Sequence, residues 1–178
     1  MSQRILNLSD ISFDDFGHGV KYPGAMKAAE KLKARLGSVG TKIGAQQLGY
    51  NVTVLPPGKR AFPFHSHRIN EEMFFVLEGA GEIRMGDQTH AIRQGDFMAR
   101  PTGGPDTAHQ IINTSTTAEL KFLAVSTMQS PEIAEYPDSA KFGVIARHPV
   151  GKDGKPEVVQ FIGRMDMAMD YWEGEDNA

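Results

Sequence analysis

Hydrophobic and polar positions along the chain change their pattern near residue 46. After that point, short runs rich in β-branched and aromatic residues alternate with stretches containing Gly and Pro. Short strands with turn signals every 8 to 12 residues or so are typical of antiparallel sandwiches and barrels. The pairs Gly86-Asp87 and Gly95-Asp96 provide residues that tolerate tight turns between such strands. The pattern therefore predicts an all-β fold. The expected strands are LGYNVTVL, EMFFVLE, GAGEIRM, THAI, FMARP, AHQIIN and ELKFLAVST.

The flanking regions are less regular, and they predict three segments. An N-terminal extension covers residues 1–45, a barrel core covers 46–127, and a C-terminal extension covers 128–178 and packs on the barrel or on a partner subunit. Within the first, residues 25–36 (AMKAAEKLKARL) have the composition of a helix. Within the last, methionines alternate with acids in RMDMAMD, which predicts an extended arm lying on an apolar groove.

The run MFFVL, residues 73–77, is apolar at every position. A strand that is apolar on both faces needs both faces covered. The barrel interior covers one face, and the other could be covered by the chain's own extensions or by a second subunit. We expect the second subunit, and so a homodimer.

Composition and charge exclude several classes of function. The net charge of -3 with scattered Lys and Arg gives no basic stripe for nucleic acid. With no cysteine, the chain cannot form disulfides, thiolate metal sites or iron–sulfur clusters, so any metal must be held by His, Asp or Glu. The first residues lack the apolar core of a signal peptide, and no run is long enough to cross a membrane. We expect a soluble cytoplasmic protein without nucleic-acid or membrane partners.

The stretch FHSHRINEEMFFVLEG carries the most informative polar residues. In an extended strand, His65 and His67 project to the same side and can converge on one ion. By the same alternation Glu72 faces the interior together with Phe74, whereas Glu71 faces away. A carboxylate buried beside apolar residues is costly unless a cation compensates it. The pattern favours Glu72 as a partner of the two histidines.

A third imidazole, His109, lies on a later strand with Ile111 and Asn113 on the same face. A return connection could bring it beside the first pair. The predicted metal ligands are His65, His67, Glu72 and His109. Imidazole and carboxylate suit one divalent ion of Zn, Fe, Mn, Ni or Cu per chain. The alternative is a polar cluster at a barrel mouth that binds no metal. The other histidines, which have no partner at ligand spacing, are expected to be exposed or hydrogen-bonded: His18, His90 and His148.

These residues resemble the two motifs of the cupin superfamily over residues 46–127. The first motif is matched by Gly58, His65, His67, Glu72 and Gly79. The second is matched by Gly95, Pro101, Gly103, His109 and Asn113, with five residues between Gly103 and His109 instead of the usual two. The six-residue spacing to Gly79 also selects Glu72 over Glu71. The resemblance implies a double-stranded β-helix, the jelly-roll barrel, with a metal inside near one mouth.

The whole chain is also similar to single-domain bacterial cupins described as sugar-phosphate-isomerase-like, through LPPGKR, EYPDSAKFGV and YWEGE. The resemblance implies a mononuclear metalloenzyme acting on a small polar metabolite. The alternatives are a cupin dioxygenase and a non-catalytic cupin that binds a small molecule. Isomerisation would need a base, and Glu72 could serve only by leaving the metal. The residues expected to line the pocket are Phe74, Val76, Ile111, Asn113 and Arg60.

Overall fold

The computed structural model describes residues 4–16, 30–148 and 157–176, and its strands form three antiparallel sheets. The largest sheet has six strands in the order β1-β2-β3-β10-β5-β8. Their bounds are β1 Asp14–Phe16, β2 Ala34–Ser38, β3 Leu48–Leu55, β10 Leu120–Thr127, β5 Glu72–Glu78 and β8 Phe97–Arg100. The sequence predicted four of these strands, β3, β5, β8 and β10, whereas β1 and β2 were not expected as strands.

The two smaller sheets complete the fold. The three-stranded sheet has the order β7-β6-β9, with bounds β7 Gln88–Arg93, β6 Ala80–Met85 and β9 His109–Ile112. The four-stranded sheet has the order β13-β12-β11-β4, with bounds β13 Glu157–Gly163, β12 Lys141–His148, β11 Glu132–Tyr136 and β4 Ser66–His67. Helical turns are short: η1 Leu8–Asp10, α2 Gly40–Ile43, η2 Pro105–Thr107, η3 Pro137–Ser139 and η4 Met165–Met167.

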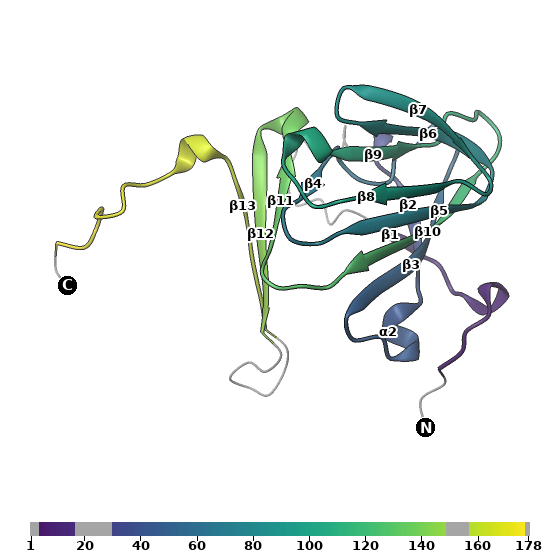
Figure 1. Cartoon of the computed structure of the whole chain (residues 1–178), viewed down its shortest axis with the longest axis horizontal. Coiled ribbons are helices and arrows are strands. Elements are labelled where there is room, and N and C mark those ends of the chain that lie inside the picture. The colour runs from purple at the N-terminus through teal and green to yellow at the C-terminus, as the bar shows by residue number, and fades with distance from the viewer. Residues whose placement is uncertain (1–3, 17–29, 149–156, 177–178) are drawn as a thin grey trace.

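The barrel core lies between the six-stranded and three-stranded sheets. Figure 1 shows β6, β7 and β9 stacked over β3, β5, β8 and β10. Inward side chains from both layers pack into one cluster that includes Phe74, Val76, Ile83, Ile111 and Phe122. Alternate residues of each strand supply this core because side chains alternate between the two faces of a sheet. The all-β, jelly-roll prediction is confirmed.

Strand β5 is apolar on both faces, as its sequence indicates. Phe74 and Val76 face the core and are buried. On the outer face the rings of Phe75 and Phe97 pack 4.3 Å apart between centroids, and Phe97 remains 72% exposed. The N-terminal strands pair at the opposite edge of the sheet, beside β3. The described part of the N-terminal extension therefore leaves the outer face at Phe97 open.

The helix predicted for residues 25–36 is wrong at its C-terminal end. Residues 25–29 lie outside the described residues, and residues 34–36 belong to β2, which pairs antiparallel with β3. Arg35 pairs with Val54, and the Ala34 side chain is fully buried against the barrel. Pairing with the sheet edge and burial of Ala34 outweigh a local helix preference that amounts to tenths of a kcal/mol per residue.

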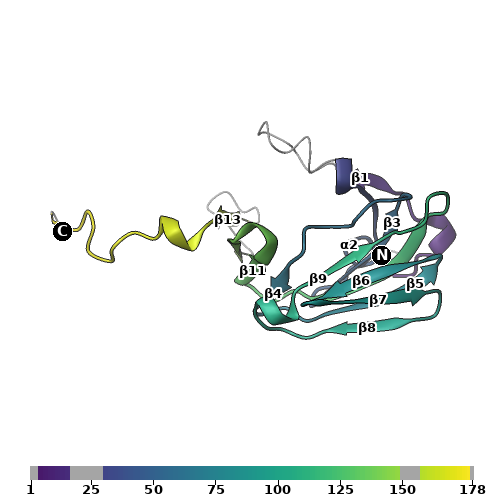
Figure 2. The same cartoon turned by 90° about the horizontal axis from the view of Figure 1, so that it is seen from above.

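The C-terminal extension adds a hairpin and a tail. Strands β11, β12 and β13 form successive antiparallel pairs, and β11 also pairs with β4 of the barrel. After β13 the chain runs away from the body of the molecule (Figures 1 and 2). Met165, Met167 and Met169 are 65–75% exposed. The arm thus lies on no groove of its own chain among the described residues, and its packing on a partner subunit stays a prediction.

Candidate metal centre

Three short strands bring the predicted ligands together. His67 ends β4, Glu72 begins β5, and His109 begins β9. His65 lies just before β4 and is held opposite His109 by a reciprocal pair of backbone hydrogen bonds. The His109 N–H donates to the His65 carbonyl oxygen at 2.8 Å, and the His65 N–H donates to the His109 carbonyl oxygen at 3.2 Å. Backbone pairing therefore fixes the approach of these two imidazoles.

The four side chains converge at one point. His65, His67 and Glu72 each offer a ligand atom within 4.8 Å of the other two. Glu72 Oε2 lies 3.3 Å from His67 Nε2 and 3.1 Å from His109 Nε2. Glu71 is exposed and stands outside the cluster. The structure thus brings together all four predicted residues and selects Glu72 over its neighbour, as the alternation of side chains along β5 predicts.

The longer gap between Gly103 and His109 does not disturb the cluster. The extra residues form the turn η2, Pro105–Thr107, where the Thr107 N–H donates to the Gly104 carbonyl oxygen at 3.0 Å. His109 still enters β9 in register with Met85 of β6. The insertion is therefore accommodated as a turn before the strand.

The donor atoms of the cluster are buried without hydrogen-bond partners among the described residues. These atoms are Nδ1 and Nε2 of His67, Nδ1 and Nε2 of His109, and Oε2 of Glu72. Buried polar atoms are almost always paired, because each unpaired one costs about 1 to 3 kcal/mol. Of these atoms, Nε2 of His67 and Nε2 of His109 both face Oε2 of Glu72, and a cation can satisfy the three together. The arrangement fits a metal site of three imidazoles and one carboxylate.

Electrostatics of the cluster favour ionised Glu72 and neutral His65. Burial, followed by the neighbouring His109, lowers the pKa of His65 from 6.5 to about 4. Burial opposes ionisation of Glu72, but His109 and His67 hold the pKa of its carboxyl well below its usual range. Burial also opposes protonation of His67, yet Glu72 and Glu132 raise its pKa. At neutral pH the cluster therefore presents a carboxylate and at least one imidazole ready to act as a neutral ligand.

Two cavities adjoin the cluster, and both are lined by His67 and Glu72. The first, of about 210 Å³, which we call the inner cavity, lies within the barrel and has mainly apolar walls with two amide side chains: Phe62, Phe74, Ile111, Phe122, Asn51 and Gln110.

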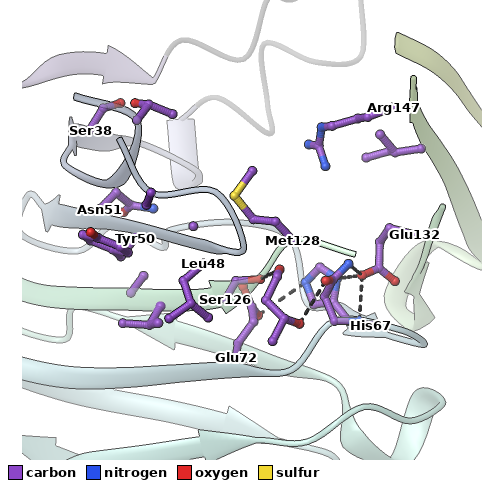
Figure 3. Close-up of a pocket in the computed structure, with 18 residues that line it drawn as sticks. Ser38, Leu48, Tyr50, Asn51, His67, Glu72, Ser126, Met128, Glu132 and Arg147 are labelled. Carbon is purple, nitrogen blue, oxygen red and sulfur yellow. Dashed lines mark hydrogen bonds and ion pairs between the residues drawn. The ribbon is translucent and has the colours of Figure 1, made fainter. Parts of the chain in front are cut away.

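The second cavity, of about 340 Å³, which we call the mouth cleft, opens beyond the cluster. Its walls include Ser38, Tyr50, Asn51, Met128, Glu132 and Arg147. Figure 3 shows His67, Glu72 and Glu132 at its base, with Arg147 on one side and Asn51 on the other. A cavity of this size matches the lower end of small-molecule sites.

The predicted pocket residues divide into two groups. Phe74 and Ile111 line the inner cavity. Val76 belongs to the core and is fully buried. Asn113 is buried and donates to the carbonyl oxygens of Leu55 and Ala118, both at 2.9 Å, so its amide is used within the fold. Val76 and Asn113 are not among the residues that line either cavity.

Arg60 also lies outside both cavities. It donates from Nη1 to Gln110 Oε1 at 3.3 Å, and Gln110 lines the inner cavity. Arg60 thus contacts a residue of the inner cavity without lining it, and the arginine that lines the mouth cleft is Arg147.

Of the remaining histidines, His90 on β7 is exposed, as predicted. His18 and the side chain of His148 lie outside the described residues. The sequence reading missed Glu132 and Arg147, which line the mouth cleft from the C-terminal hairpin. Their positions depend on pairing between β11, β12 and β4, for which the sequence carries no motif.

Comparison with known proteins agrees with the fold and the cluster. Residues 51–126 match the family model described as Cupin domain. This segment contains all four residues of the cluster, His65, His67, Glu72 and His109. With the barrel described above, the match shows that residues 51–126 form a cupin domain.

Among solved structures, the chain is similar to a cupin-superfamily sugar phosphate isomerase from Silicibacter pomeroyi. The two are 28% identical with a TM-score of 0.73, over 92% of this chain and 94% of that one. A predicted oxalate decarboxylase from Thermotoga maritima shares the fold, at 21% identity and a TM-score of 0.54 over 70% of this chain and 99% of that one.

Among curated proteins, cupincin from Oryza sativa subsp. indica is 34% identical over 93 residues. The match covers 50% of this chain but only 18% of the rice protein. The chain therefore corresponds to a small part of that relative. Separately, among the described residues, none of the helices has the length and apolar character needed to cross a membrane.

Proposed function

We propose that the protein is a mononuclear metalloenzyme that acts on a small polar metabolite. The observation that carries the proposal is a set of three buried atoms that face one another and have no hydrogen-bond partner in the described part of the chain. They are Nε2 of His67, Nε2 of His109 and Oε2 of Glu72. His65, His67, Glu72 and His109 would hold one divalent transition metal ion. When bound, such an ion supplies Lewis-acid polarisation of a carbonyl or hydroxyl oxygen.

The mouth cleft would admit the metabolite, and its walls indicate the metabolite's chemistry. Hydroxyl and amide groups from Ser38, Tyr50 and Asn51 line one side. On the other side, the Arg147 guanidinium has no ion pair or hydrogen bond within the described part of the chain, whereas Arg68 and Arg84 are paired with acids. A free guanidinium binds carboxylate or phosphate well because its donors match two oxygens at once. Arg147 would orient an anionic group of the substrate.

Sugar phosphate isomerisation is one reaction that this proposal includes, in line with the similarity to the Silicibacter pomeroyi protein. It needs a base beside the substrate carbon. Among described residues, the acids that line the two cavities are Glu72 and Glu132. Glu72 belongs to the donor cluster, and Glu132 accepts hydrogen bonds from the backbone. Isomerisation would therefore require Glu72 to exchange its ligand role for that of a base.

The direct test is turnover of a panel of aldose and ketose phosphates and hydroxy acids by the metal-loaded protein. Under the proposal, wild type turns over an anionic member of the panel, and Arg147→Gln raises KM about tenfold or more with a smaller change in kcat. Arg164→Gln, at an arginine that lines a different pocket, is the matched control and leaves KM unchanged. Tight binding of a panel member without turnover would instead identify a binding protein.

An oxygen-dependent reaction is the second candidate, and the inner cavity is the observation that favours it. Phe62, Phe74 and Phe122 give this cavity an apolar wall beside the cluster, suited to a small apolar molecule such as dioxygen. The candidate predicts iron in the purified protein and oxygen uptake when substrate is added. Zinc in the purified protein, with no oxygen uptake, would exclude it.

We also propose that the chain forms a homodimer. Two apolar surfaces support this: the outer face of β5 and β8, where Phe97 is 72% exposed, and the tail with Tyr171 and Trp172, which are 83% and 71% exposed. Exposed apolar surface of this kind commonly marks an interface. Light scattering on the purified protein should give twice the mass of the chain, and Phe97→Asp should shift it toward the monomer if the outer face is the contact.

A further inference from the structure

We propose that Glu132 is a positioning residue that fixes the ring of His67, so that Nδ1 carries the proton and Nε2 is free for the metal. The inference rests on the proposed metal site, and it concerns a residue outside the segment that matches the family model. Glu132 begins β11, in the C-terminal hairpin. It lies outside both sequence motifs.

Glu132 is buried and held rigidly. Its side chain is 6% exposed. Oε1 accepts the backbone N–H groups of Ile133 at 2.8 Å and Ile69 at 3.3 Å. Oε2 accepts the backbone N–H of Asn70 at 3.0 Å and is also contacted by the Asn70 side-chain amide. Four donors pointing at one carboxyl group leave it little freedom to rotate.

His67 lies between this fixed carboxylate and the donor cluster. Its Nδ1 is 3.5 Å from Glu132 Oε2, and its Nε2 is 3.3 Å from Glu72 Oε2 (Figure 3). Both ring nitrogens of His67 face a carboxylate, but only Nε2 faces the other donor atoms of the cluster. A metal ion held there would replace the hydrogen on Nε2, whereas Nδ1, which faces Glu132 alone, would keep its hydrogen. Outer carboxylates that fix the tautomer of a ligating histidine raise metal affinity in this way.

His65 is oriented in the same way, by a backbone carbonyl oxygen instead of a carboxylate. Its Nδ1 lies 2.8 Å from the carbonyl oxygen of Pro63, an acceptor that keeps the hydrogen on that nitrogen. Both histidines of the His-x-His pair therefore face their acceptors with Nδ1. For His65 the acceptor comes from the adjacent loop, whereas for His67 it comes from the hairpin through the pairing of β11 with β4.

The register of that pairing explains why Glu132 reaches His67. Ala134 pairs with His67, and Glu135 pairs with Ser66. Glu132 lies two residues before Ala134, so both project toward the same face of β11, and both are buried. Glu135 projects to the other face and pairs with Arg68 at 2.7 Å. The same strand thus supplies the positioning carboxylate and a matched control.

The first experiment measures Zn²⁺ affinity by competition with a chelator, for wild type, Glu132→Gln, Glu135→Gln and His67→Ala. Each variant is first shown to be folded by circular dichroism. We expect Glu132→Gln to weaken Zn²⁺ binding about 10- to 100-fold and Glu135→Gln to stay within about twofold of wild type. Tight binding by wild type with unchanged affinity in Glu132→Gln overturns the positioning role alone. Absence of Zn²⁺ binding by wild type overturns the metal site and this role together.

The second experiment needs no variant that disturbs Glu132, which matters because a glutamine amide would turn N–H groups toward backbone N–H groups there. Protein with ¹⁵N-labelled histidine is loaded with Zn²⁺, and the two ring nitrogens of His67 are distinguished by their ¹⁵N shifts and long-range couplings to ring protons. His67→Ala assigns the signals. We expect a protonated Nδ1 and a metal-bound Nε2. Zn²⁺ on Nδ1, or a proton on Nε2, contradicts the inference.

Discussion

His65 illustrates, at the scale of single residues, how burial prepares the cluster for a metal. Its imidazole is buried and close to His109, and its pKa falls to about 4 as a result. A metal ligand must be the neutral imidazole, so this residue needs no deprotonation near pH 7. The same shift has a consequence for the stability of the metal-free protein.

We expect the unfolding free energy of the metal-free protein to fall as the pH is lowered from 6.5 to about 4. The unfolded chain takes up a proton on His65 near its ordinary pKa of 6.5, whereas the folded protein does so only near 4. Proton uptake by the unfolded state in this window disfavours folding, by at most about 3 kcal/mol at the lower end. His67 has a raised pKa, so its effect on the unfolding free energy falls mainly above this pH window. Glu72 has a lowered pKa, so its effect falls mainly below the window.

Urea unfolding of chelator-treated protein at several pH values measures this slope. His65→Gln provides the control, since glutamine has no proton to gain. A flatter profile in the variant than in wild type is the expected result. Equal slopes in the two proteins would show that His65 is not the group responsible.

Asn113 gives a second prediction at this scale. Its amide donates to Leu55 and Ala118 and accepts from the N–H of Ser115 at 3.0 Å. Asn113→Ala leaves two buried carbonyl oxygens without their donor, and we expect a loss of roughly 2 to 4 kcal/mol of unfolding free energy. Metal affinity measured on the folded fraction should stay near the wild-type value. A lower metal affinity with an unchanged unfolding free energy would instead indicate that Asn113 acts in the site and not in the fold.

Residue-level prediction succeeded where the chemistry is local. His65, His67 and Glu72 follow from strand alternation and motif spacing within eight residues of sequence, so the choice of Glu72 needed no knowledge of the rest of the fold. Glu132 and Arg147 reach the mouth cleft only through the pairing of β4, β11 and β12. No local pattern encodes that register, so the sequence alone could not identify them.

At the scale of elements, turns and pairing at the sheet edge decide which of the predicted strands and helices form. Runs of apolar residues predicted the barrel strands because their inward positions must fill one core. The predicted helix at residues 25–36 failed at β2 because helix preference is weak beside pairing with a neighbouring strand. The turn between β5 and β6, by contrast, rests on a single glycine of the first motif.

Gly79 forms this turn with a φ of +84°, and an added Cβ would overlap the Glu119 carbonyl oxygen. We expect Gly79→Ala to lower the unfolding free energy by roughly 2 kcal/mol or more, from backbone strain and the contact together. Gly58→Ala is the matched control: Gly58 has a φ of +71°, and nothing lies within 4 Å of an added Cβ. Thermal unfolding of both variants measures the difference, and an equal loss would mean that the contact contributes nothing.

At the scale of the whole molecule, the cluster joins all three sheets. His67 comes from the four-stranded sheet, Glu72 from the six-stranded sheet and His109 from the three-stranded sheet. A cation held by these side chains would tie the sheets together in the folded state only. Metal binding should therefore stabilise the fold as a unit, rather than one strand or one hairpin.

Removing the metal is thus expected to lower the unfolding temperature. At a free metal concentration 100 times Kd, binding adds about 2.7 kcal/mol to the unfolding free energy. Calorimetry of metal-loaded and chelator-treated protein measures this difference, and adding back Zn²⁺ should restore the original transition. An identical transition in both samples would show that no metal is bound to the folded state.

Metal content is the most direct test of the central claim. The protein is purified without an affinity metal or chelator, and metal per chain is measured by elemental analysis for wild type and His67→Ala. About one transition metal ion per chain in wild type, largely lost in His67→Ala, is the expected result. No metal in wild type, even after reconstitution with Mn, Fe, Ni and Zn, would contradict the account and leave a cupin that binds its ligand without one.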